Sequence, residues 1–159
     1  MKKLIAGNWK MNGGLQANEA LLQAVLAGLP SGERACDSAV CVPAVYLSQV
    51  QRLLGASALK WGAQDVSAHE QGAYTGEISA GMLREFGCRY VLVGHSERRQ
   101  YHGETDAQVA VKAQRALACG VTPIVCVGET LQEREAGQTM QVVKRQLAAV
   151  IHTVGHCVT

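Results

Sequence analysis

The sequence has few charged residues and no long apolar run, and these features argue against a nucleic-acid-binding protein and a membrane protein. Charged residues make up 18% of the 159 residues, and the net charge is +2. No run of lysine or arginine suited to a phosphate backbone is present, so nucleic acid is not an expected partner. No stretch approaches the ~20 apolar residues of a membrane span, and residues 4–7 are too short for the core of a signal peptide. We therefore expect a cytoplasmic protein without a membrane partner.

The six cysteines form no C-x-x-C pair, which removes the usual sign of a redox motif or zinc site. Cys41 and Cys126 lie within apolar runs, where a thiol behaves as a small hydrophobic group, so we expect free thiols. The nearest approach to a set of metal ligands is His152, His156 and Cys157. A glycine interrupts their spacing and no complete ligand set is visible, so we predict no metal there. The role of these three residues stays open.

No linker, low-complexity tract or second domain is apparent in these residues. Instead, apolar runs typical of strands alternate along the chain with segments whose apolar residues recur at helical spacing. Continuous apolar runs, typical of parallel strands covered on both faces, occur at residues 3–7, 39–42, 59–63, 89–93 and 122–127. Segments with one apolar helical face follow them at residues 21–29, 45–54, 78–86, 105–120 and 142–151. Five such β-α units predict an α/β fold in one domain.

Two of these helices carry more detailed expectations. The sequence TDAQ at residues 105–108 predicts a capping box at the start of the fourth helix, and Gly120 predicts its end. In the third helix, the apolar spacing predicts that Ile78, Met82, Leu83 and Phe86 face inward.

Polar residues, and in one case a glycine, follow the ends of four predicted strands. They are Asn8 and Lys10, Gln64 and Asp65, His95 and Glu97, and Gly128 and Glu129. Ligands of parallel α/β folds bind outside the carboxyl ends of the strands, so we expect these groups to converge on one site. An ammonium, an imidazole, an amide and carboxylates together suit an anionic small molecule with a carbonyl group. Singly, each has a structural explanation: a solvated charge, a hydrogen-bonded histidine, or a salt-bridge carboxylate.

Five motifs, in this order and spacing, resemble the triosephosphate isomerase family: AGNWKMN, GAQDVS, GAYTGEIS, YVLVGHSERR and CVGETLQEREAGQT. The resemblance runs from Lys3 to about Ile151. It implies a (β/α)8 TIM barrel, here truncated to about five parallel β-α units, with residues 1–159 as a single incomplete barrel domain. It also implies a cytoplasmic isomerase of glycolysis and gluconeogenesis, which interconverts dihydroxyacetone phosphate and glyceraldehyde 3-phosphate through an enediolate, without a cofactor.

The resemblance also implies roles for individual residues. Asn8 and Lys10 match substrate-binding residues, and the Lys10 ammonium would stabilise negative charge on phosphate and enediolate oxygens. His95 matches the electrophile that polarises the carbonyl, kept neutral at the N-terminus of a short helix that begins at Ser96. Glu97 matches a carboxylate beside the lysine.

A further loop of the family bears on oligomeric state. Thr75 matches the tip of a loop that, in the family, inserts into the partner subunit of a homodimer. This role would account for the long polar segment that follows Asp65. The expected partners are therefore a small phosphorylated triose and a second copy of the chain.

Three features of the family have no match among these residues: the strand ending in Tyr-Glu-Pro-Val-Trp, the lid, and the glycine-rich phosphate loops. The glutamate of that strand is the general base that removes the carbon-bound proton. A positioned general base contributes about 10²–10⁴-fold to a rate, so we expect the 159-residue chain alone to be inactive.

Two other interpretations stay open. One is a truncated, non-catalytic isomerase-like protein that acts through interactions. The other is a complete doubly wound domain that binds a phosphorylated ligand, although the G-x-G-x-x-G and G-x-x-x-x-G-K-[ST] patterns are absent. Strand order separates this last possibility from the barrel, because a broken barrel has the order 1-2-3-4-5 and a doubly wound domain has 2-1-3-4-5.

Overall fold

The computed structural model describes residues 2–32 and 34–155, and in these residues five parallel strands form one sheet. The strands are β1 (Lys3–Asn8), β2 (Cys36–Val42), β3 (Leu59–Ala63), β4 (Tyr90–Val93) and β5 (Thr122–Val125). The helices are α1 (Leu15–Gly28), the 3-10 turn η1 (Ala44–Tyr46), α2 (Leu47–Leu54), α3 (Ala80–Glu85), α4 (Ser96–His102), α5 (Asp106–Ala118), α6 (Leu131–Glu135) and α7 (Thr139–Val154).

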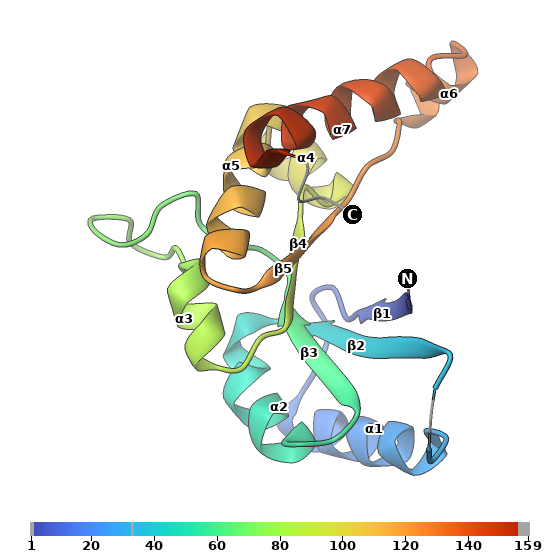
Figure 1. The fold of residues 1–159 in the computed structure, drawn as a ribbon, viewed down its shortest axis with the longest axis vertical. Coiled ribbons are helices and arrows are strands. Elements are labelled where there is room, and N and C mark those ends of the chain that lie inside the picture. The colour runs from blue at the N-terminus through green and yellow to red at the C-terminus, as the bar shows by residue number, and fades with distance from the viewer. Residues whose placement is uncertain (1, 33, 156–159) are drawn as a thin grey trace.

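The strands follow one another in the sheet in the order β1-β2-β3-β4-β5. This order confirms the interpretation as part of a barrel and excludes the doubly wound alternative. Figure 1 shows that the sheet curls and that the helices lie on its outer side. The carboxyl ends of β1, β3 and β4 therefore come to the same end of a half-barrel.

Local sequence signals explain the position of α5. The hydroxyl of Thr105 accepts a hydrogen bond from Gln108 N at 3.2 Å, and Thr105 N donates to Gln108 Oε1 at 2.9 Å. This confirms the predicted capping box, which satisfies two backbone groups that the first turn would leave unpaired. At the other end, Gly120 adopts a φ of 73°, the left-handed conformation that commonly follows a helix.

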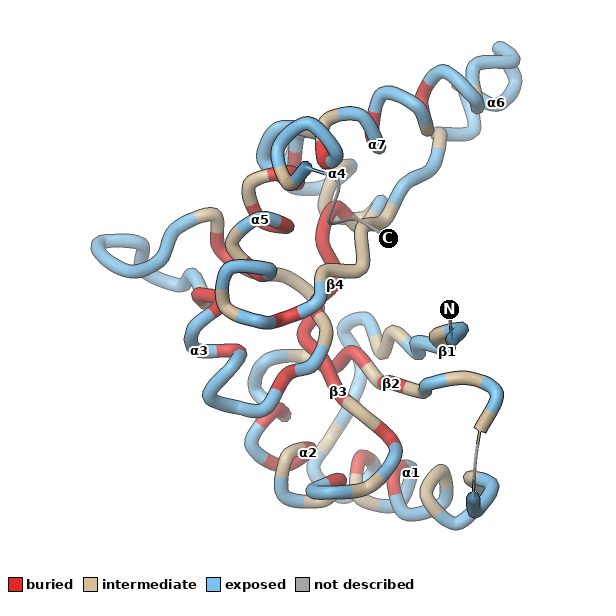
Figure 2. The backbone as a smooth tube through the Cα atoms, viewed as in Figure 1, coloured by how far each residue is buried: buried red, intermediate tan, exposed pale blue. Residues whose placement is uncertain are grey.

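The buried core lies around the middle of the sheet. On β3 and β4 the buried residues include Leu59, Trp61, Ala63, Val91 and Val93. In Figure 2 these two strands are largely red, whereas β1 is pale blue and tan. Helices α2 and α5 supply the outer side of the core, through residues such as Val50, Leu54, Val109, Ala113 and Ala116.

The prediction that every strand is covered on both faces is wrong for the two edge strands. Neither β1 nor β5 contains a buried residue, and the side chain of Ile5 is 61% exposed. Among the described residues, each of these strands pairs with one neighbour, β1 with β2 and β5 with β4. Apolar sequence alone does not reveal whether a strand has a second neighbour or a layer against its inner face.

Two helix predictions also need correction. Leu83 is buried, but Met82 and Phe86 are exposed, and Ile78 precedes α3 rather than belonging to it. With six residues, α3 has less than two turns and buries only a narrow stripe. The five-residue helix α6 was not predicted, because it is too short to show a period; the capping box of Thr130 and Glu133 was the available signal.

The described cysteines are free thiols, as expected. Burial is the largest effect on the two most enclosed of them and raises the pKa of the Cys41 thiol, and that of Cys88, to about 12. In the described ranges, no helix combines the length and apolar character that crossing a membrane requires.

Candidate functional site

A cavity of about 620 Å³ lies where the sequence predicted a site, at the carboxyl ends of β1, β3 and β4. Its lining includes Asn8, Lys10, Gln64, His95 and Glu97, which lie at the ends of these strands or shortly after them. The predicted convergence is thus confirmed for three strand ends. The cavity is large enough for a small phosphorylated molecule.

The loop after β1 holds Lys10 in an unusual conformation. Lys10 has a φ of 53° and is the one non-glycine residue with positive φ in the described chain. Lys10 N donates to Asn8 Oδ1 at 2.9 Å, and the Gln64 side-chain amide donates to Lys10 O at 2.7 Å and to Asn8 Oδ1 at 3.1 Å. A strained backbone of this kind persists where its surroundings over-determine it, and such positions cluster at functional sites.

The ammonium of Lys10 is paired across the cavity mouth with Glu97. The distance between Lys10 Nζ and Glu97 Oε1 is 2.7 Å. This hydrogen bond and the charge of Glu97 raise the pKa of Lys10 above its ordinary value, and the same hydrogen bond lowers the pKa of Glu97. Both groups are therefore charged at neutral pH, and an ion pair stands at the mouth of the cavity.

His95 begins helix α4 as its N-cap residue. Its Nδ1 accepts a hydrogen bond from Glu97 N at 3.2 Å, so Nδ1 carries no proton and the ring proton resides on Nε2. The ring is therefore a neutral donor. Glu97 Oε2 lies 3.5 Å from Nδ1, but this contact is not an ion pair because the nitrogen already accepts from a backbone N–H.

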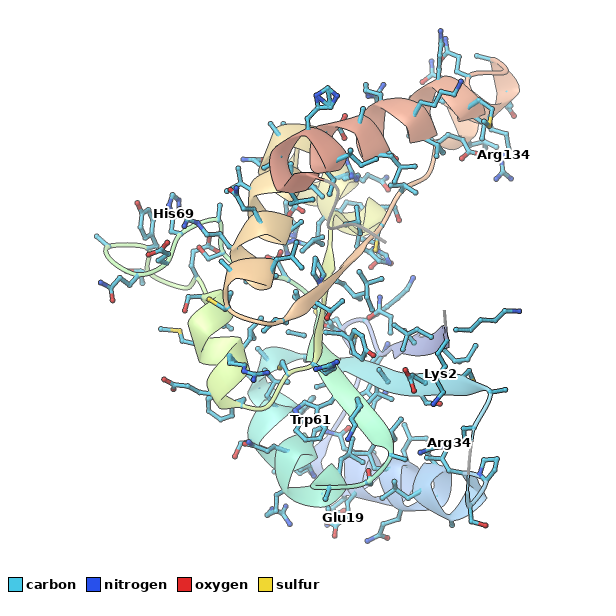
Figure 3. The ribbon with its side chains drawn as sticks, viewed as in Figure 1. Lys2, Glu19, Arg34, Trp61, His69 and Arg134 are labelled. Carbon is cyan, nitrogen blue, oxygen red and sulfur yellow. The ribbon has the colours of Figure 1, made fainter. Side chains whose placement is uncertain are left out.

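Two predicted residues lie outside the cavity lining. Ser96 is the exposed first residue of α4. Thr75 is exposed on the segment between β3 and α3, which projects from the body of the molecule in Figure 1. Within this segment the rings of His69 and Tyr74 stack with centroids 3.7 Å apart, and Figure 3 labels His69 on it. Arg115 of α5 donates to Ala68 O at 3.1 Å and fixes the base of the segment.

The prediction that the end of β5 joins the site is wrong. Gly128 bonds with the side chain of Gln146 on α7, and Glu129 pairs with Arg134 at 2.7 Å. Neither residue lines the cavity. Figure 1 shows the segment after β5 running away from the sheet toward α6, and Figure 3 labels Arg134 there.

A network of four charges under the site includes three residues that the sequence reasoning missed. Lys112 Nζ lies 2.9 Å from both Asp65 Oδ1 and Glu104 Oε2, and Arg98 lies 3.1 Å from Asp65 and 3.0 Å from Glu104. Burial alone would raise the pKa of Glu104, but hydrogen bonds from Lys112 and Arg98 outweigh it and lower that pKa. The available signal was Lys112, a charged residue on the apolar face of α5.

The predicted absence of a metal near the end of the chain is not tested. His152 is an exposed residue of α7, whereas His156 and Cys157 lie outside the described residues. In ranges 2–32 and 34–155, no three histidine, cysteine or carboxylate side chains gather as metal ligands would.

Comparison with known proteins decides the family. The family model for triosephosphate isomerase matches residues 3–158. The chain belongs to the triosephosphate isomerase family. Curated triosephosphate isomerases of Paracidovorax citrulli and Delftia acidovorans are each 73% identical to it, over 159 and 157 residues. These alignments cover 99% of this chain and 63% of each relative, so the chain spans about 63% of the length of these triosephosphate isomerases.

A solved structure supports the same family assignment at the level of the fold. The triosephosphate isomerase of Bartonella henselae matches with a TM-score of 0.84 at 39% identity, over 94% of this chain and 62% of that chain. The curled sheet is therefore the TIM-barrel fold over its first five β-α units.

Proposed function

We propose that this chain supplies the electrophilic half of a triosephosphate isomerase site, and that it forms a single incomplete barrel domain. The reaction is the interconversion of dihydroxyacetone phosphate and glyceraldehyde 3-phosphate in glycolysis and gluconeogenesis, in the cytoplasm and without a cofactor. The observation that carries the proposal is the arrangement of the Lys10–Glu97 pair and the neutral ring of His95 on one cavity.

Each of these groups has a distinct part in the proposed chemistry. The Nε2–H of His95 donates to the carbonyl oxygen of the substrate and then transfers its proton between the two oxygens of the enediolate. The ammonium of Lys10 stabilises the negative charge that develops on those oxygens and that of the phosphate. Glu97 holds Lys10 at 2.7 Å, and Asn8 supports the strained backbone of the same loop. One such preorganised donor is worth about 2.7–4 kcal/mol of transition-state stabilisation.

The carboxylates that line the cavity are already engaged. Asp65 pairs with Lys112 and Arg98, Glu97 pairs with Lys10, and Glu77 accepts from the hydroxyl of Ser67 at 3.3 Å. Ion pairs thus hold two of the three, and no carboxylate of these residues matches the general base of the family. We therefore propose that the 159 residues alone bring together the electrophile but do not turn the substrate over.

The proposed partner is a second copy of the chain. Met11 and Tyr101, on the cavity rim, are 95% and 71% exposed, more than apolar side chains of this size usually are. The Thr75 segment projects from the same end of the molecule as a self-supported loop that a partner could receive. The non-catalytic alternative has no comparable observation in its favour, and the 73% identity to an isomerase points away from it.

A hybrid enzyme tests the assigned roles. Residues 1–159 would replace the aligned segment of the Paracidovorax citrulli isomerase, whose remaining residues complete the protein. We expect the hybrid to turn over triose phosphates, and His95→Gln to lower kcat by about 10²–10⁴-fold. His152→Gln, an exposed change on α7, serves as the matched control and should leave kcat unchanged. A His95→Gln hybrid with the kcat of the control would refute the proposal.

A further inference from the structure

The position of His95 depends on the residue before it. Gly94 is buried and has a φ of 69°, a left-handed conformation that side chains other than glycine rarely adopt. A Cβ at this position would lie 2.8 Å from both terminal methyl carbons of Val109 and 2.9 Å from Arg99 Nη2. The strand end is thus packed directly against α5 and against the guanidinium of Arg99.

Charged side chains bind both polar groups of Gly94. Its N–H donates to Glu104 Oε1 at 3.1 Å, and its carbonyl accepts from Arg99 Nε at 2.8 Å. Hydrogen bonds to charged groups are shorter and stronger than those between neutral groups. The peptide units on either side of Gly94 are therefore held in one orientation, and with them the backbone of His95.

Arg99 is itself anchored on two other elements. Its Nη1 lies 2.6 Å from Asp106 Oδ1 at the start of α5, and its Nη2 donates to the carbonyl of Cys126, after β5, at 3.3 Å. Burial alone would raise the pKa of Asp106, but hydrogen bonds from Arg99 and Arg145 outweigh it, so this carboxylate stays charged at neutral pH. The guanidinium of Arg99 thus connects the end of β4, the start of α5 and the segment after β5.

From these contacts we infer that Arg99 is a positioning residue for His95, acting through the carbonyl of Gly94. Arg99 is not among the residues that line the cavity, so its effect on a bound substrate would be indirect. Its effect is to hold His95 at the start of α4, where Nδ1 accepts from Glu97 N and Nε2 keeps the proton. A lysine cannot replace it, because one ammonium lacks the planar fork that reaches Gly94, Asp106 and Cys126 together. The inference deepens the proposed function, since it assigns a residue that sets the protonation form of the proposed electrophile.

The test is the ¹⁵N spectrum of the His95 imidazole in the histidine-labelled 159-residue chain, compared with Arg99→Met and Arg145→Met. Arg145 Nε also binds Asp106, at 3.0 Å, but has no contact with Gly94, so Arg145→Met controls for disturbance of α5. We expect the control to keep the Nε2–H form. In Arg99→Met the ratio of Nε2–H to Nδ1–H forms should fall about tenfold, the effect of one charge-assisted hydrogen bond.

Arg99→Lys provides a second variant that retains the positive charge beside Asp106, and it should show the same change as Arg99→Met. His95 spectra of the Arg99 variants that match the spectrum of Arg145→Met would overturn the inference.

The hybrid enzyme gives a second readout that separates the two proposals. There we expect Arg99→Met to lower kcat about tenfold or more with little change in KM, because a displaced His95 stabilises the transition state less. An unchanged kcat would overturn the positioning role. A hybrid without any turnover would overturn the proposed function, and the ¹⁵N comparison would still decide whether Arg99 positions His95.

Discussion

The middle of the sheet and its edge strands have similar sequences but different surroundings. Both β4 and β5 are short apolar runs, yet β4 has three buried residues and β5 has none. The difference is in the neighbouring strands of the described sheet, since α5 contacts both: β4 lies between β3 and β5, whereas β5 pairs with β4 alone. The two edge strands also differ from each other: Lys10 follows β1 and lines the cavity with His95 after β4, whereas the segment after β5 turns away from the cavity.

The largest expected effect comes from adding one methyl group at the middle of the sheet. In Gly62→Ala the new Cβ would lie 2.3 Å from the carbonyl oxygen of Tyr90, a backbone atom that cannot move aside. We expect a loss of about 3 kcal/mol or more in the free energy of unfolding. At the edge, the new Cβ of Gly7→Ala would lie 4.0 Å from its nearest atom, the carbonyl oxygen of Ala39. This substitution should change the free energy of unfolding by about 0.5 kcal/mol or less. Urea unfolding followed by circular dichroism compares the two, and equal losses would contradict the contrast.

The second effect concerns charges and pH. Glu104→Gln weakens the network under β4 and should cost about 2–3 kcal/mol at neutral pH, since Asp65 still pairs with Lys112. Lys2→Met breaks the exposed Lys2–Asp37 pair beside β1 and should cost about 0.5 kcal/mol or less.

The pH dependence of the first variant follows from the direction of the pKa shift. The folded pKa of Glu104 lies below its ordinary value of 4.5, so the unfolded chain binds more protons in acid. The stability from this carboxylate is complete above the ordinary pKa and is lost as the pH falls through the folded pKa. Thermal unfolding between about pH 7 and about pH 3 should therefore show the gap between wild type and Glu104→Gln closing in acid. A gap that is constant with pH would contradict this assignment.

The smallest effect comes from the same substitution on two paired strands. Val93 of β4 and Val125 of β5 are partners in the sheet register, but only Val93 is fully buried. Val93→Ala should lower the free energy of unfolding by about 2 kcal/mol and Val125→Ala by about half as much, because the half-buried side chain of Val125 already contacts water. The comparison uses urea midpoints. If Val125→Ala cost as much as Val93→Ala, the helix-covered face of β5 would be as enclosed as that of β4.

Local signals in the sequence account for most of the elements and for part of the site. The capping box at Thr105, the apolar strands and the polar residues after β1, β3 and β4 were readable, because each depends on neighbours in the chain. The exposure of Ile5 depends on which strands stand beside β1, so the apolar run of residues 3–7 does not show it by itself. The hydrogen bond from Arg99 to the carbonyl of Gly94 could not be predicted either, because it depends on how β4 packs against α4 and α5.

The most direct test of the account is the rate of triose phosphate interconversion by the 159-residue chain and by the hybrid in one assay. We expect turnover by the hybrid and a rate no faster than buffer for the chain alone, because no cavity carboxylate matches the general base of the family. A chain that alone reached within about tenfold of the hybrid would contradict it, since a missing general base should cost about 10²–10⁴-fold.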